Sequence, residues 1–203
     1  MNNAPPPPPV PMSLLARVLL TFVLVLGLLA YAWKAQEPQA SQGRPPATLT
    51  EAGKTITLND YSAELWQKDV KLSDDKPLIL FVYTSWCPYC HKMFPLVNAL
   101  AAEAKDMNVI AVSIDRDRAA LANYLATQQP LALMPRTITD PYQQLDFIEA
   151  LQAEQLRYQG SIPFLAVFYQ GKPIAEVPGA LEKAELDSMV SDIRAQISAA
   201  QQP

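Results

Sequence analysis

Cysteine and histidine are almost absent from this chain, which has two cysteines and one histidine among 203 residues. Two cysteines cannot form a disulfide framework or a four-cysteine zinc site. One neighbouring histidine leaves a closed tetrahedral zinc site short of ligands, so we predict no metal. The chain also lacks a basic stripe and a glycine-rich phosphate loop, and its net charge is −4. These absences argue against nucleic-acid binding.

The two cysteines and the histidine stand together in the segment Cys87-Pro88-Tyr89-Cys90-His91. An apolar run, Leu78 to Tyr83, precedes this segment, and a helical pattern from Lys92 to Ala104 follows it. The pattern predicts a Cys-x-x-Cys motif where a strand leads into a helix. The first cysteine would lie at the positive end of the helix dipole, which favours its thiolate. We therefore predict a redox pair in which Cys87 is the nucleophile and Cys90 the resolving cysteine.

Two other interpretations compete with a redox pair. The same five residues match Cys-x-x-Cys-His, the attachment pattern of c-type haem. A haem needs an axial ligand beyond His91, for which Met93, Met107 and Met134 are candidates, but it does not need a preceding buried strand. A purely structural disulfide would close a very short loop, which removes little unfolded-state entropy. The redox interpretation is favoured, and it requires no cofactor because the cysteines carry the electrons.

Three segments precede the predicted domain. Residues 1–12 are proline-rich and predict a disordered tail. Residues 13–33 are apolar apart from Arg17, and about 20 such residues span a bilayer, so we predict a transmembrane signal anchor. A cleaved signal peptide is the alternative, because Ala30-Tyr31-Ala32 fits a small-x-small cleavage site. Residues 34–50 are rich in Pro, Gln, Ala and Ser and predict a flexible linker.

Residues 51–198 predict one domain, followed by a short tail at 199–203. Strands are expected at residues 55–58, 78–84, 108–114, 133–138, 164–169 and 173–177. Helices are expected at residues 62–68, 88–105, 117–127, 142–155 and 181–197. Strands that alternate with helices indicate an α/β fold, to which the last hairpin adds an antiparallel edge.

From Lys76 to Ile197 the chain resembles thioredoxin-fold thiol–disulfide oxidoreductases. Trp86 precedes the cysteine motif, Pro95 lies inside the following helix, and Gly160-Ser161-Ile162-Pro163-Phe164 matches the cis-proline loop of that family. The resemblance implies a thioredoxin-like fold, with a central mixed sheet flanked by helices, and a cis Ile162–Pro163 bond.

The resemblance also implies a substrate groove beside the two cysteines. Its lining residues would be Trp86, Pro88, Tyr89, Ile162 and Pro163. The alternative for Trp86 is packing at the edge of the domain. His91 would stand behind the cysteines or at the surface, where its cationic form favours the nearby thiolate.

Finer resemblances point in two directions. Between Asp115 and Pro163 the chain is longer than thioredoxin and predicts a helix-strand-helix insertion, similar to membrane-anchored TlpA/ResA-like thiol reductases. The dipeptide Pro88-Tyr89 instead matches glutaredoxins and disulfide isomerases of the Dsb group. The insertion favours a reductant, while an oxidant or isomerase and a non-catalytic thioredoxin-like binding module stay open.

The resemblance places the catalytic domain on the periplasmic side of the inner membrane, attached by a single-pass helix. Its partners would be client proteins with thiols or disulfides. A redox donor or acceptor would complete the cycle, and a membrane-embedded protein near the tether is one candidate.

One position departs from thioredoxins and bears on the mechanism. Phe81 stands where thioredoxins carry a buried acid that helps to deprotonate the second cysteine. Glu149, Asp140 and water are candidates for the proton route, and the sequence does not choose among them.

Overall fold

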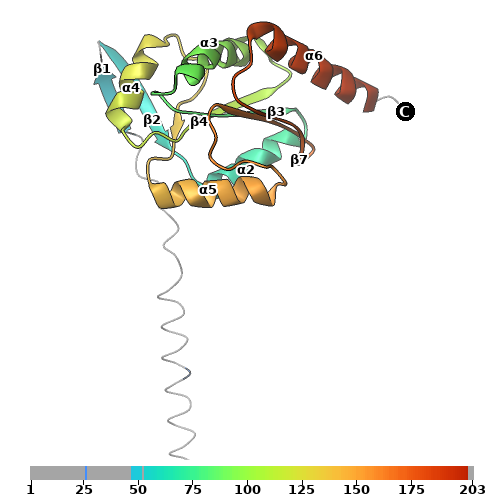
Figure 1. Cartoon of the computed structure of the whole chain (residues 1–203), viewed down its shortest axis with the longest axis horizontal. Coiled ribbons are helices and arrows are strands. Elements are labelled where there is room, and N and C mark those ends of the chain that lie inside the picture. The colour runs from blue at the N-terminus through green and yellow to red at the C-terminus, as the bar shows by residue number, and fades with distance from the viewer. Residues whose placement is uncertain (1–25, 27–46, 52, 201–203) are drawn as a thin grey trace, which may run out of the picture. The chain divides into compact units, whose positions relative to one another are not determined.

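The computed structural model describes residue 26, residues 47–51 and residues 53–200 (Figure 1). Its strands are β1 (Ala47–Glu51), β2 (Lys54–Asp60), β3 (Leu78–Tyr83), β4 (Asn108–Ser113), β5 (Arg136–Thr137), β6 (Phe164–Tyr169) and β7 (Lys172–Pro178). Its helices are α2 (Ala63–Asp69), the 3-10 helix η1 (Val70–Ser73), α3 (Pro88–Glu103), α4 (Arg118–Thr127), α5 (Pro141–Ala153) and α6 (Lys183–Ala200).

These strands form one mixed sheet in the order β1-β2-β5-β4-β3-β6-β7. The central strand β3 is parallel to β4 and antiparallel to β6. β5 lies between β4 and β2 and is parallel to both, while β1 and β7 form antiparallel edges. α4, β5 and α5 connect β4 to β6, so the predicted helix-strand-helix insertion is present.

β3 is buried on both faces, because successive side chains of a strand point to opposite sides of the sheet. Its odd-numbered residues, from Ile79 to Tyr83, pack with residues of α3, α4 and α6. Its even-numbered residues, from Leu78 to Val82, pack with residues of α2 and α5. Helices therefore cover both faces of the sheet, which accounts for the unbroken apolar run (Figure 1).

The helices around the sheet begin in two different ways. The side chains of Ser62, Asp117 and Asp140 accept hydrogen bonds from backbone N–H groups in the first turns of α2, α4 and α5. α3 instead begins after Cys87, whose side chain makes no capping bond, with Pro88 in its first turn. The positive end of the α3 dipole therefore lies at Cys87, with no capping bond from the side chain of that residue.

β1 lies across the predicted boundary between linker and domain. Residues 47–50 belong to the segment predicted as linker, yet they pair with β2 in register from Ala47 opposite Leu58. Gly53, with φ of +75°, lies in the tight turn between the two strands, a conformation that glycine adopts without a steric penalty. The sheet therefore begins before Glu51.

The predicted strand at 133–138 is reduced to the two residues of β5, which pair in register with β2 and β4. The flanking Pro135 and Ile138 each add one backbone hydrogen bond, to Asn59 and Ser113. At the other end of the chain α6 continues to Ala200, beyond the predicted domain end at 198.

Residues 1–12 and, apart from Leu26, residues 13–33 lie outside the described residues, as do residues 34–46 of the predicted linker. The predictions of a tail, an anchor and a linker therefore concern segments that the structure does not describe. Among the residues that it does describe, no helix is both long and apolar enough to cross a membrane.

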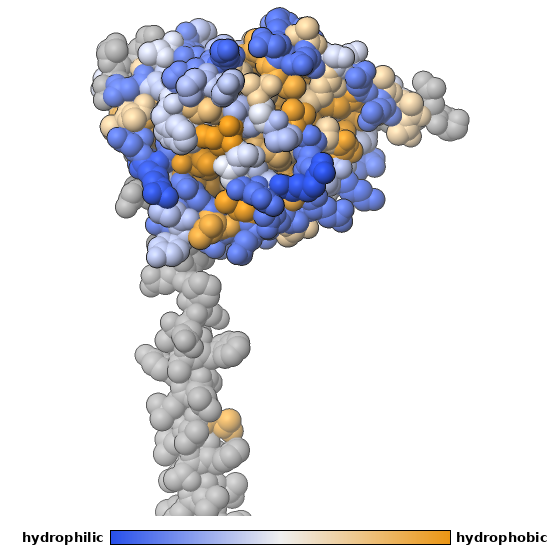
Figure 2. Space-filling view, viewed as in Figure 1, coloured by the Kyte–Doolittle hydropathy of each residue, from blue (hydrophilic) through white to orange (hydrophobic). Residues whose placement is uncertain are grey.

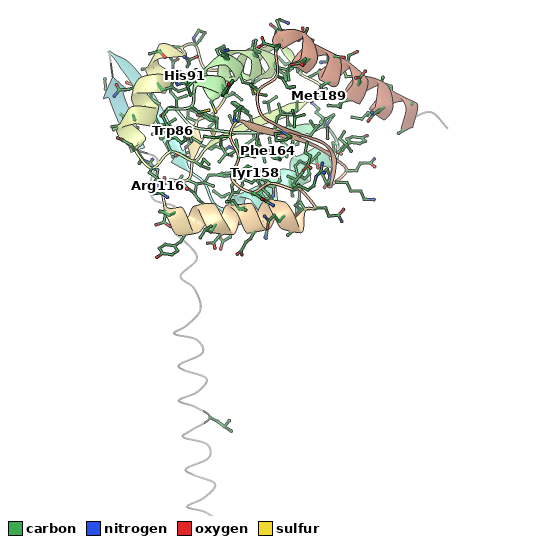
Figure 3. All side chains as sticks on the ribbon, in the orientation of Figure 1. Trp86, His91, Arg116, Tyr158, Phe164 and Met189 are labelled. Carbon is green, nitrogen blue, oxygen red and sulfur yellow. The ribbon has the colours of Figure 1, made fainter. Side chains whose placement is uncertain are left out.

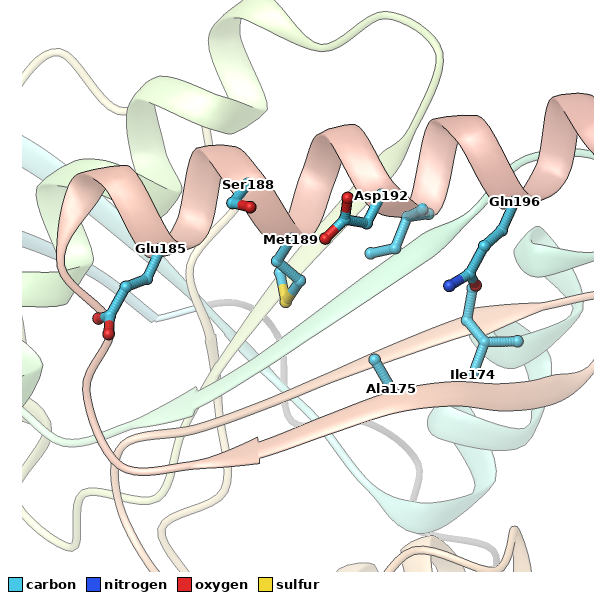
Figure 4. Close-up of a pocket in the computed structure, with 8 residues that line it drawn as sticks. Ile174, Ala175, Glu185, Ser188, Met189, Asp192 and Gln196 are labelled. Atoms are coloured by element: carbon cyan, nitrogen blue, oxygen red, sulfur yellow. The ribbon is translucent and has the colours of Figure 1, made fainter.

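β7 is an outer strand of the sheet, and α6 passes over it. The groove between them is lined by Ile174 and Ala175 from β7 and by Met189 and Asp192, among others, from α6 (Figure 4).

On the face of the domain that Figure 2 shows, apolar side chains gather near the middle and polar side chains surround them.

Candidate functional site

The two cysteines lie where β3 leads into α3, as the sequence predicts. Cys87 occupies the N-cap position of α3, and Cys90 lies in the first turn of that helix. Both are free thiols; Cys87 is 5% exposed and Cys90 is fully enclosed. Cys87 is therefore the thiol with more access to a partner.

The surroundings of Cys90 oppose its ionisation. Burial, as the main cause, raises the pKa of the Cys90 thiol to about 12, and the neighbouring Cys87 and Asp115 add to the rise. A hydrogen bond from the backbone of Thr84 acts in the opposite direction. Cys90 therefore stays protonated at neutral pH.

The loop before β6 carries the predicted cis Ile162–Pro163 bond. Pro163 is buried, and its carbonyl accepts a hydrogen bond from the backbone N–H of Gly179 at 2.8 Å. Ile162, half-buried, lines a cleft of about 520 Å³ together with Trp86 from the loop before Cys87. The structure therefore brings the cysteine loop and the cis-proline loop to a common cleft.

Two aromatic side chains beside the cysteines face solvent. Trp86 is 69% exposed and Tyr89 is 61% exposed, and the Lys92 ammonium lies 5.8 Å from the centre of the Tyr89 ring. Trp86 therefore does not pack into the domain edge (Figure 3). Large exposed aromatic side chains are typical of surfaces that bind another protein.

His91 lies between the cysteine loop and α4. Its Nε2 atom bonds to the backbone carbonyl of Ser85, which requires the Nε2–H tautomer or the cation. Its ring stacks on Tyr124 of α4, with ring centres 4.6 Å apart and an angle of 13° between the planes. Nε2 is therefore occupied by a protein carbonyl, which disfavours the haem interpretation.

Comparison with known proteins agrees with this geometry. The model of the Redoxin family matches residues 47–187. The chain belongs to the Redoxin family. The predicted identity as a thioredoxin-fold thiol–disulfide oxidoreductase is thereby confirmed.

Curated relatives of this redoxin carry related names. It is 25% identical over 147 residues to a thioredoxin of Mycobacterium tuberculosis, a match that covers 72% of this chain and 95% of the relative. It is 33% identical over 116 residues to the thiol:disulfide interchange protein DsbE of Pasteurella multocida, covering 51% and 59%. A thiol:disulfide interchange protein of Chlorobium tepidum of known structure shares 18% identity at a TM-score of 0.49, covering 74% and 96%.

At the position of the thioredoxin acid, this redoxin is apolar. Phe81 is fully buried and stacks on Tyr83, with ring centres 5.4 Å apart and planes at 5°. The buried acid near the cysteines is Asp115, just beyond the end of β4. Sequence reasoning did not assign it a role, although an acid placed directly after a buried strand was a usable signal.

Asp115 is the hydrogen-bond acceptor of the cysteine loop. Its carboxylate accepts bonds from the Ser85 backbone N–H at 2.8 Å, the Ser85 hydroxyl at 2.7 Å and the Ser113 hydroxyl at 2.7 Å. These charge-assisted bonds fix the loop that positions Cys87. The same charge contributes to the raised pKa of Cys90.

The acids proposed from the sequence for the proton route lie elsewhere. Asp140 caps α5 by accepting from the backbone N–H groups of Tyr142 and Gln143 at 2.9 and 3.0 Å. Glu149 is exposed on α5. Neither contributes to the pKa shift of Cys90, whereas Asp115 does. Within the described residues no group of three or more His, Cys, Asp or Glu side chains is placed to bind a metal.

Proposed function

We propose that this redoxin is a membrane-tethered oxidoreductase of the cell envelope that reduces disulfides in client proteins. Cys87 is its nucleophile and Cys90 its resolving cysteine. The observation that carries the assignment is the difference between the two thiols. Cys87 is the more exposed and stands at the uncapped start of α3, while Cys90 is enclosed with a pKa of about 12.

The reaction proceeds in two exchanges. The Cys87 thiolate attacks one sulfur of a client disulfide, so that a Cys87–client bond forms and the client's own S–S bond breaks. The released client sulfur takes up a proton. Cys90 then gives up its proton and attacks the Cys87 sulfur, so that the Cys87–Cys90 bond forms and the Cys87–client bond breaks. The departing client sulfur takes up a proton and leaves as the second client thiol. Two electrons have moved from the redoxin to the client.

The client lies in an extended conformation across the cis-proline loop. Pro163 has no backbone N–H, so the backbone of Ile162 pairs with the client strand. Trp86, Pro88 and Tyr89 provide apolar contact beside the sulfurs. His91 stands behind the motif, held by its bond to the Ser85 carbonyl and by its stacking on Tyr124.

The direction of electron flow depends on the reduction potential of the cysteine pair. The α4-β5-α5 insertion supports a reductant by its likeness to envelope thiol reductases. The Pro88-Tyr89 dipeptide supports an oxidant or isomerase instead. Equilibration of the Cys87–Cys90 pair with glutathione decides between them, because a reductant has a potential well below that of the glutathione couple.

Insulin reduction tests the catalytic assignment. The wild-type protein should reduce insulin, Cys87→Ser should abolish the activity, and Cys90→Ser should accumulate a mixed disulfide through Cys87. A non-catalytic binding module would show no reduction by the wild-type protein. Trapping through Cys90 in the Cys87→Ser variant would reverse the assigned roles.

The tether and location rest on residues 13–33, which have the length of a single span, and on the compartments where disulfides persist. The N-terminus would be cytoplasmic and residues from Lys34 onward would face the envelope space. Mass spectrometry of the mature protein, with membrane fractionation, tests this. A mature N-terminus at Trp33 would show a cleaved signal, and an intact chain in the soluble cytoplasmic fraction would overturn the location.

A further inference from the structure

The cleft that borders the loop before Cys87 is lined, among the described residues, by one positively charged side chain, Arg116, and by two acids, Asp115 and Asp117. Trp86 borders the cleft from the cysteine loop, Ile162 from the cis-proline loop, and Arg116 from the loop between β4 and α4. Trp86 and Arg116 lie on the same side of the domain (Figure 3). A client strand at the cis-proline loop would therefore pass close to the Arg116 guanidinium.

The acids on either side of Arg116 are already engaged. Asp115 is buried and accepts three hydrogen bonds from Ser85 and Ser113. Asp117 caps α4 by accepting from two backbone N–H groups at 2.9 and 3.1 Å. Neither carboxylate is an ion-pair partner of Arg116, although both are its sequence neighbours.

Arg116 differs in this respect from the other arginines of the domain. Each of the other four between residues 53 and 200 is ion-paired with a carboxylate, namely Arg118, Arg136, Arg157 and Arg194. Arg116 is exposed, and no ion pair joins it to any residue that the structure describes. Its guanidinium is thus available to a ligand in the cleft.

We infer that Arg116 selects client proteins that carry an Asp or Glu side chain near their reactive cysteine. This inference rests on the proposed function, since the client must dock beside Cys87. A guanidinium binds a carboxylate with two parallel hydrogen bonds, which fixes orientation as well as charge. A lysine or arginine at the same client position meets a like charge and is disfavoured.

The size of the preference follows from the exposure of the pair. Solvent-exposed ion pairs are weak, so replacing a neutral client residue by Glu should raise kcat/KM by about 2- to 5-fold. Exchange of Glu for Lys doubles the charge difference, so the two ratios multiply and kcat/KM should change by about 4- to 25-fold. High salt should reduce the difference, because the groups are screened by solvent ions.

Reduction of matched disulfide peptides tests the inference. Each peptide carries Glu, Gln or Lys at the residue directly before or directly after one reactive cysteine. The value of kcat/KM is measured for every peptide. The full-length wild-type protein should prefer Glu over Lys at one of these positions. Arg116→Gln should remove that preference, and Arg116→Lys should restore part of it.

Lys183→Gln is the matched control. It removes one positive charge from an exposed side chain of α6 that does not line the cleft, and it should keep the preference for Glu. Equal rates for Glu and Lys peptides in the wild type would overturn the inference. So would a preference that survives Arg116→Gln, or one that Lys183→Gln removes equally.

Failure of the proposed function is a separate outcome. If neither insulin nor any peptide is reduced, the oxidoreductase assignment fails. Binding of peptides with Ser in place of both cysteines, measured by calorimetry, then still tests Arg116. Tighter binding of the Glu peptide that is lost in Arg116→Gln supports the charge selection, and equal binding of the Glu and Lys peptides refutes it.

Discussion

Asp115 accepts hydrogen bonds from both the backbone N–H and the hydroxyl of Ser85, at 2.8 and 2.7 Å. The carbonyl of the same Ser85 bonds to Nε2 of His91 in α3. Ser85 is therefore fixed on one side by the end of β4 and on the other by α3. Because Ser85 lies two residues before Cys87, this arrangement helps to set the position of Cys87.

Removal of the Asp115 carboxylate should destabilise the fold. Asp115→Ala leaves the buried Ser85 and Ser113 donors without their acceptor, and we expect a loss of about 2–4 kcal/mol in the free energy of unfolding. Ser85→Ala is the milder control, because it removes one bond and should cost about 1 kcal/mol. Urea unfolding of the reduced proteins measures both. Equal losses in the free energy of unfolding for the two variants would contradict the role of the Asp115 carboxylate in holding both serines.

The structural role of Asp115 shows why the sequence predicted the motif and not its support. The Cys-x-x-Cys segment is contiguous, and its flanking strand and helix follow from local apolar patterns. Asp115 reaches Ser85 across 30 residues of sequence, through the parallel pairing of β3 with β4. The position of Asp115 after a buried strand is a local signal, but no local pattern identifies Ser85 as its partner, and the sequence therefore suggested Asp140 and Glu149 instead.

β1 and β5 show the same limit for secondary structure. β1 is a short edge strand with the composition Ala-Thr-Leu-Thr-Glu, and it follows a proline-rich segment that predicts a linker. Its structure depends on pairing with β2. The apolar run at 133–138 predicts a longer strand, but only Arg136 and Thr137 reach partners on both sides. Asn98 instead bonds to the chain at Pro130, Ala132 and Leu133.

The buried Cys90 thiol should make the stability of the reduced protein depend on alkaline pH. Its pKa is raised to about 12, above the value of about 8.5 for a free cysteine. The folded state thus favours the protonated thiol. The stabilisation that this thiol adds to the free energy of unfolding is complete below about pH 8.5 and declines as the pH rises toward 12.

The comparison of wild type with Cys90→Ala isolates this contribution. Denaturant unfolding of both reduced proteins at pH 7 and at pH 10 gives the free-energy difference between them at each pH. That difference should shift against the wild type at pH 10. Burial is the main cause of the raised pKa of Tyr83 and is common to both proteins, but Cys90 adds to the rise, so the measured difference includes this coupling between Cys90 and the buried tyrosine. A difference that stays constant would contradict the raised pKa of Cys90.

The ring of Tyr124 should contribute to stability and its hydroxyl should not. The ring stacks on His91 and meets Phe94 edge-on at 5.5 Å, whereas the buried hydroxyl has no hydrogen-bond partner among the described residues. Tyr124→Phe should change the free energy of unfolding by less than about 0.5 kcal/mol. Tyr124→Ala should cost about 2–4 kcal/mol through the lost packing. Thermal unfolding compares the two variants, and a costly Tyr124→Phe would show that the hydroxyl is bonded.

Two ion pairs should differ in strength according to their burial. Asp69 accepts a hydrogen bond from the Tyr61 hydroxyl at 2.7 Å and pairs with Arg136, so it joins α2 to β5 of the insertion. Its side chain and that of Arg136 are 21% and 18% exposed. Asp106 and Arg194 form a bidentate pair whose side chains are 51% and 48% exposed.

Asp69→Asn should therefore destabilise the protein by about 1–3 kcal/mol, because it weakens a partly buried network. Asp106→Asn should cost less than about 1 kcal/mol, since exposed pairs are screened by solvent.

The hydrogen bond from Arg194 is the main reason that the pKa of Asp106 lies below its ordinary value. A lowered carboxyl pKa stabilises the folded state above the ordinary value near 4 and ceases to do so as the pH falls through the lowered value. The small difference between wild type and Asp106→Asn should thus be present at pH 7 and vanish in acid, as urea unfolding at both pH values will measure. A loss for Asp106→Asn that equals or exceeds that for Asp69→Asn at pH 7 would show that burial does not rank these pairs.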